Sequence, residues 1–77
     1  MNINIHKFLK QFQKEYNFLY DNDYVAGQDE AVAEFDKLIK NKNFAQFVGE
    51  FVKFRGDIIS SDREAAAFMF ALYELAL

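Results

Sequence analysis

The chain has 77 residues, no cysteine and a formal net charge of −3, and 52% of its residues are hydrophobic. A chain of this length packs a single hydrophobic core, so we expect one domain over residues 1–77, and the apolar content excludes a disordered chain. The negative charge argues against nucleic acid as a direct ligand, because phosphate binding depends on clustered Lys and Arg.

The start of the chain has no apolar core of the length that a signal peptide requires, and the chain has no apolar run long enough for a membrane-spanning helix. In its first ten residues, MNINIHKFLK, no more than two apolar residues are consecutive, and no stretch of about 18 apolar residues occurs anywhere in the chain. We therefore expect a cytoplasmic protein that does not associate with membranes.

Apolar residues recur at steps of three and four in the first part of the chain, which predicts an amphipathic helix over about 4–20. The stripe consists of Ile5, Phe8, Leu9, Phe12, Tyr16, Leu19 and Tyr20. Asn2 or Asn4 can cap the start of this helix, because a short side-chain oxygen accepts a hydrogen bond from a free backbone N–H. The run 21–23 favours a turn, and Gly27 permits a positive φ in the connection that follows.

A second helix is expected over about 28–41 and a third over about 43–55, with Asn43 as the cap of the third. Gly56 follows the third helix and suits a left-handed helix end. Gly49 lies inside this helix, where it costs on the order of 1 kcal/mol relative to alanine. Two explanations of this glycine stay open: another helix crosses closely at this position, or the fold simply tolerates the cost.

The last helix is expected over about 61–76. The residues from Ser61 to Glu64 match the capping box, in which the Ser hydroxyl and the Glu carboxylate each bind a backbone N–H. From Ala65 to Leu77 the only charged residue is Glu74. A helix that is apolar on all sides must be covered on all sides, so we expect an all-α fold, a small four-helix bundle with the C-terminal helix at its centre.

Three short helices enclose a central helix incompletely in a domain this small. Two alternatives stay open: the chain encloses the last helix fully, or apolar surface remains for a second copy or a partner. The residues expected at such an oligomer interface are Phe47, Phe51, Phe54, Phe70, Tyr73 and Leu77.

No set of residues predicts a catalytic, cofactor or metal site. The chain has no Cys and no Thr, and its two serines stand at a predicted helix start. Asp21 and Asp23 have the spacing of the first two ligands in a calcium loop. However, Val25, Ala26 and Val32 occupy the fifth, sixth and twelfth positions, where such a loop needs an oxygen ligand, a glycine and a glutamate. We expect a protein that is not an enzyme and holds no cofactor or metal.

Charge is distributed unevenly along the chain. From Glu15 to Asp36 there are seven acidic residues and no Lys or Arg. This segment is either an ordinary solvated surface or a surface that attracts a basic site on another protein. In the second alternative, the partner-binding residues are Asp21, Asp23, Asp29, Glu30, Glu34 and Asp36.

These features favour an interaction protein, expected as a homodimer, that docks on a larger complex and blocks or adapts it. Inhibitors of bacterial defence made by phages and mobile elements, anti-CRISPR proteins included, share this short, acidic and helical profile, as a likeness of class. The acidic residues would then fill a basic groove that a nucleic-acid-handling complex offers to nucleic acid.

Two other hypotheses remain at this point. The first is a structural, regulatory or antitoxin-like subunit that binds its partner through apolar surface of the third and fourth helices. The second is a nucleic-acid binder that uses Lys7, Lys10 and Lys14, and we expect no such activity from an acidic chain.

Overall fold

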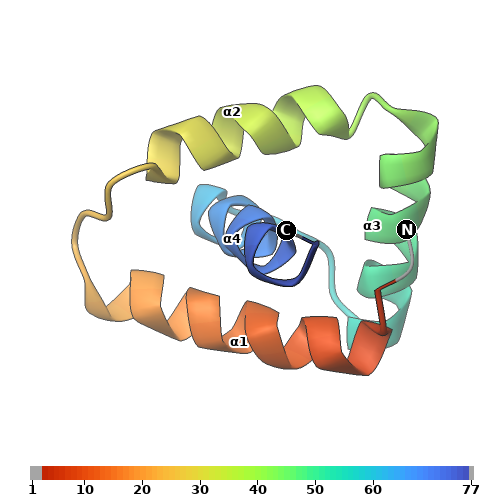
Figure 1. Ribbon diagram of the computed structural model, residues 1–77, viewed down its shortest axis with the longest axis horizontal. Helices are drawn as coiled ribbons and strands as arrows, with labels where there is room; N and C mark the ends of the chain where they lie inside the picture. The colour runs from red at the N-terminus through yellow and green to blue at the C-terminus, as the bar shows by residue number, and fades with distance from the viewer. Residues whose placement is uncertain (1–2, 77) are drawn as a thin grey trace.

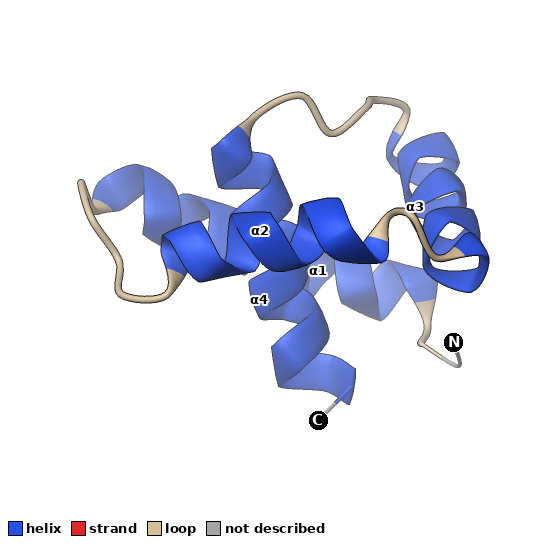
Figure 2. Cartoon of the chain, turned by 90° about the horizontal axis from the view of Figure 1, so that it is seen from above, coloured by secondary structure: helices blue, strands red, loops and turns tan. Residues whose placement is uncertain are grey.

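The computed structural model describes residues 3–76, which form four helices and no strand, so the predicted all-α fold is confirmed. The helices are α1 (Ile5–Asp21), α2 (Gln28–Leu38), α3 (Lys42–Arg55) and α4 (Asp62–Ala76). In Figure 1, α1, α2 and α3 form three sides of a frame, and α4 passes through it. Figure 2 shows from above that the C-terminal part of α4 projects beyond the other helices. The C-terminal helix is therefore central, as predicted.

Small side chains explain how α4 fits inside the frame. Its buried residues are Ala65, Ala66, Ala67, Phe68, Met69, Ala71 and Leu72. Alanines let neighbouring backbones approach closely, and the contacts of α4 with α1 and with α2 are the most extensive between helices. The α3 backbone stands further away, and its phenylalanine side chains bridge the distance to α4.

Phe68 is the centre of the core. Its side chain is fully buried, and its ring centroid lies 4.7 Å from that of Phe8 in α1 and 5.6 Å from that of Phe35 in α2. From α3, the rings of Phe51 and Phe44 lie 5.2 and 5.7 Å away. Tilted aromatic pairs of this kind contribute about 0.5–1.5 kcal/mol each beyond the area they bury. One side chain therefore ties α4 to all three helices of the frame.

The ends of α1 and α2 follow local hydrogen bonds. Asn4 caps α1, since its Oδ1 accepts a hydrogen bond from the Lys7 N–H at 3.1 Å, whereas Asn2 lies outside the described residues. α2 ends at Leu38, which corrects the end near residue 41 that the sequence predicts. The chain tightens there, because the Asn41 N–H donates to the Leu38 carbonyl at 2.8 Å, only three residues back.

The starts of α3 and α4 correct two further predictions. Asn41, not Asn43, caps α3, because its Oδ1 accepts from the N–H groups of Asn43 and Phe44 at 3.0 and 3.2 Å. α4 begins at Asp62, and the Ser61 hydroxyl accepts from the Glu64 N–H at 3.1 Å. The return bond goes one residue further back than in a capping box, from the Ser60 N–H to the Glu64 carboxylate at 2.9 Å.

Glycines stand at two of the bends. Gly27, before α2, and Gly56, after α3, have φ values of 87° and 81°, which confirms both predictions of a left-handed backbone. Gly49 is exposed, and a Cβ at that position would meet no atom within 4 Å. Tolerance, and not a close helix crossing, explains this glycine.

Arg55 and Glu64 fasten the connection between α3 and α4. Their side chains form an ion pair with an N–O distance of 2.9 Å, and they are only 12% and 14% exposed. The Arg55 guanidinium also donates to the carbonyls of Asp57 and Ile58, and it lies over the ring of Phe12 in α1. This arginine therefore both binds carbonyls and meets a carboxylate, and it ties the connection to α1.

The surroundings of Glu64 also change its pKa. Burial acts to raise the pKa of this carboxyl, but hydrogen bonds from the Ser60 N–H and hydroxyl, together with the Arg55 guanidinium, outweigh burial and hold the pKa below its ordinary value of 4.5. A carboxyl with a lowered pKa contributes stability that is present above the ordinary pKa and is lost as the pH falls through the folded pKa.

We predict that Phe68→Ala lowers the free energy of unfolding by about 3–5 kcal/mol, because it leaves a cavity where rings from three helices meet. Urea titration followed by circular dichroism measures this change. The control is Phe18→Ala, whose ring is 52% exposed and whose loss should cost about 0.5 kcal/mol. Similar losses in the two variants would show that Phe68 does not centre the core.

We also predict that Glu64→Gln removes part of the acid sensitivity of the fold. In the unchanged chain, the free energy of unfolding should decline as the pH drops from above 4.5 through the folded pKa of Glu64. Urea titrations at several pH values compare the two proteins, with Asp23→Asn as a control that retains the decline due to Glu64. An unchanged pH dependence in Glu64→Gln would contradict this role.

Candidate functional site

Four of the six acidic residues expected to bind a partner lie together at one end of the molecule. Asp21 ends α1, Asp23 lies in the connection that follows, and Asp29 and Glu30 stand in the first turn of α2. Figure 1 shows this bend of the chain at the end opposite α3. All four residues are exposed. We name the α1–α2 end by these carboxylates and two neighbouring tyrosines: Tyr20, Asp21, Asp23, Tyr24, Asp29 and Glu30.

Glu34 and Asp36 lie apart from each other. Two residues on a helix are separated by about 200° around its axis, so the two side chains leave α2 on different flanks. Asp36 borders a shallow depression together with Asp62 at the start of α4. Glu34 is partly buried, and its charge acts on Tyr73 near the end of α4. The structure thus brings four of the six predicted residues together and sets these two on separate surfaces.

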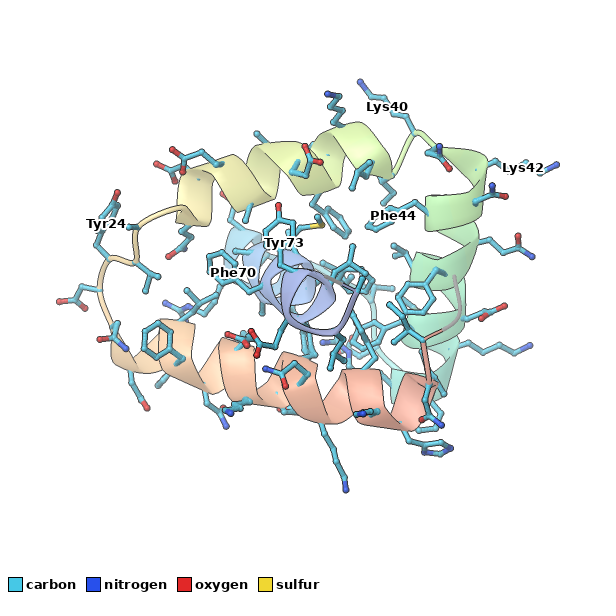
Figure 3. The ribbon with its side chains drawn as sticks, in the orientation of Figure 1. Tyr24, Lys40, Lys42, Phe44, Phe70 and Tyr73 are labelled. Carbon is cyan, nitrogen blue, oxygen red and sulfur yellow. The ribbon has the colours of Figure 1, made fainter. Side chains whose placement is uncertain are left out.

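Tyr20 and Tyr24 are the site residues that the sequence analysis missed. With 66% and 74% exposure, they are the most exposed large hydrophobic side chains of the described chain. Figure 3 shows Tyr24 on the connection between α1 and α2, projecting away from the helices. The guanidinium carbon of Arg63 lies 5.1 Å from the centroid of the Tyr20 ring. For Tyr24, the sequence signal that could have identified it as a site residue is its position within the acidic run. Tyr20 carries no such signal, because the periodicity places it on the apolar stripe of the first helix.

The four carboxylates differ in what they do for the fold. Asp29 and Glu30 lie near the positive end of the α2 dipole, and they stabilise a helix whose first residue is preceded by Gly27 without a side-chain cap. Asp21 lies in the last turn of α1, where a negative charge is unfavourable. Within residues 3–76, neither Asp21 nor Asp23 takes part in an ion pair. The structure gives these two aspartates no stabilising role.

Some of the residues predicted for an apolar interface are buried in the core, and others are exposed. Phe47 and Phe51 are 5% and 0% exposed, because α1 and α4 cover them, and this place in the core corrects the prediction that they face a second copy. Phe54 is 42% exposed, and its ring meets that of His6 edge to face at 4.6 Å.

Phe70 and Tyr73 form a separate exposed pair on α4. Their ring centroids lie 6.4 Å apart, Tyr73 is 38% exposed and Phe70 is half-buried. Figure 3 shows both side chains beside α4, which is seen end-on. Leu77, the last residue predicted for the interface, lies outside the described residues.

Comparison of the chain with known protein families, with curated proteins and with solved structures gives no match. Within residues 3–76, no three His, Cys, Asp or Glu side chains gather as they would around a metal ion. The helices of this part of the chain also lack the combination of length and apolar character needed to cross a bilayer.

The pKa of Tyr73 depends on how close Glu34 lies to it. Burial raises the pKa of the Tyr73 hydroxyl above its ordinary value of 10.0, and the negative charge of Glu34 raises it further. We predict that Glu34→Gln lowers the pKa of Tyr73, as measured by NMR titration of its ring signals. Asp29→Asn, at the α1–α2 end, is the control and should leave that titration unchanged. If Glu34→Gln has no effect either, Glu34 does not face α4.

Proposed function

We propose that this protein is a non-enzymatic interaction module that binds a basic surface of a partner protein through the α1–α2 end. The observation that supports this proposal is the combination of two aspartates without a stabilising role, Asp21 and Asp23, with two largely exposed tyrosines. Tyrosines contribute strongly to protein interfaces, because they offer large contact area at little cost in conformational entropy. The carboxylates around them would attract and orient a basic partner.

The local charge of this end matters more than the net charge of the chain. The molecule is 30 Å long, and Figure 3 shows Lys40 and Lys42 at the corner between α2 and α3, away from Tyr24. At physiological ionic strength, charges on the surface are screened over roughly 8 Å. The chain carries nine Lys and Arg residues in all, and one of them, Arg63, lies at the Tyr20 ring. A partner that approaches the α1–α2 end therefore meets four carboxylates with the Arg63 guanidinium beside them.

The biological setting that we propose is inhibition of a bacterial defence complex by a phage or mobile-element protein, an assignment that rests on likeness of class alone. In that setting, the carboxylates of the α1–α2 end occupy a basic groove of a nucleic-acid-handling complex. The protein acts in the cytoplasm and does not itself bind nucleic acid. Detection of a tagged chain in fractionated source cells tests the location.

A second candidate function uses the exposed Phe70 and Tyr73 pair. A partly exposed aromatic pair on α4 suits a structural, regulatory or antitoxin-like subunit, or the contact between two copies in a homodimer. The response to salt separates the two functions, because affinity based on charge falls steeply as ionic strength rises and apolar docking is nearly indifferent to it. Sedimentation of the purified chain tests the homodimer.

We predict that Asp21→Lys abolishes partner binding while it stabilises the fold by about 0.3–1 kcal/mol, because a positive charge is favourable at the C-terminal end of α1. Affinity capture from source cells at low and high salt measures binding, and thermal unfolding measures stability. Opposite effects on the two quantities separate a binding role from loss of structure.

The matched control is Glu50→Lys, which makes the same reversal of charge at an exposed position on α3. This variant should retain the partner. Retention of the same partner by Asp21→Lys as well would rule out the α1–α2 end. Capture that does not change with salt but is lost in Tyr73→Ala would favour the apolar function.

A further inference from the structure

Arg63 shows what kind of group the α1–α2 end accepts. This residue stands in the first turn of α4, and its guanidinium carbon lies 5.1 Å from the centroid of the Tyr20 ring. Within residues 3–76 it forms no ion pair, and its position near the positive end of the α4 dipole is unfavourable for a cation. The Tyr20 ring is thus already oriented to receive a guanidinium, and the one that it holds is weakly fixed.

An exposed ring that has a carboxylate close by in the chain suits arginine better than lysine. A guanidinium stacks on an aromatic face and at the same time donates two parallel hydrogen bonds to a carboxylate, whereas an ammonium offers a compact charge. Asp21 follows Tyr20 directly, and Asp23 precedes Tyr24, so each exposed ring has a carboxylate next to it in the chain. An aromatic ring together with a carboxylate therefore binds the side chain of arginine in preference to that of lysine.

We propose that the α1–α2 end recognises an arginine-rich segment of its protein partner and selects arginine over lysine. Arg63 lies over one face of the Tyr20 ring in the free protein and gives up this place to an arginine of the partner. The inference rests on the proposed function, and it adds the chemistry of the partner and a residue of α4 that competes with it.

The test uses the full chain and two labelled peptides of equal charge, nona-arginine and nona-lysine, whose binding is followed by fluorescence anisotropy at low salt. Stacking on exposed rings should make nona-arginine bind about tenfold more tightly. Tyr20→Leu combined with Tyr24→Leu should make the two affinities equal. Phe54→Leu, which removes a 42% exposed ring on α3 at the opposite end of the molecule, is the matched control and should keep the difference.

Arg63→Lys tests the competition, because it keeps the charge and weakens the stacking. This variant should bind nona-arginine more tightly than the unchanged chain does and bind nona-lysine equally well. No change for either peptide would overturn the role of Arg63. Equal affinities of the unchanged chain for the two peptides would overturn arginine selection and leave the proposed function standing, whereas the absence of binding to both at low salt would overturn the two together.

Discussion

The fold depends on the fit of α4 into the frame made by the other helices. Around Phe68, α4 carries mainly alanines, and these allow α1 and α2 to approach closely. The phenylalanines of α3 then reach across a wider gap to the same ring. Because α1 and α2 are both held by α4, the connection between them has a defined position, and the α1–α2 end is presented by two anchored helices.

Much of this architecture could be predicted from the sequence, because the information is local or periodic. Steps of three and four placed the helices, and the uniformly apolar last helix had to be central. The ends were less predictable. Asn41 and Asn43 are equally good caps as residue types, and the choice depended on how tightly the chain turns after Leu38. Such a turn depends on hydrogen bonds that no composition rule contains.

The candidate site was only partly predictable for a similar reason. The acidic run was visible, but the face on which Glu34 or Asp36 lies depends on which side of α2 packs against α4. Periodicity places Tyr20 on the apolar stripe. It does not show at which residue the stripe ceases to be covered by other helices. Leu19 is the last buried residue of α1, and Tyr20 lies about 100° further around the helix, in solvent.

Charge order distinguishes α1 from α2. In α2 the acids precede the lysine, as the helix dipole favours, whereas α1 has no acid in its first turn and no basic residue in its last. α1 therefore gives up a small amount of stability at Asp21. Natural proteins tend to accept such losses where a surface serves binding and not folding.

The late position of α4 in the chain has a consequence for synthesis on the ribosome. The main helix contacts of α1 and α2 run to α4, whereas phenylalanines of α1 and α3 also pack on each other. As the chain emerges from its N-terminus, the apolar faces of α1 and α2 therefore lack their main cover until α4 is available. Apolar surface that stays uncovered during synthesis is the kind of surface that chaperones bind.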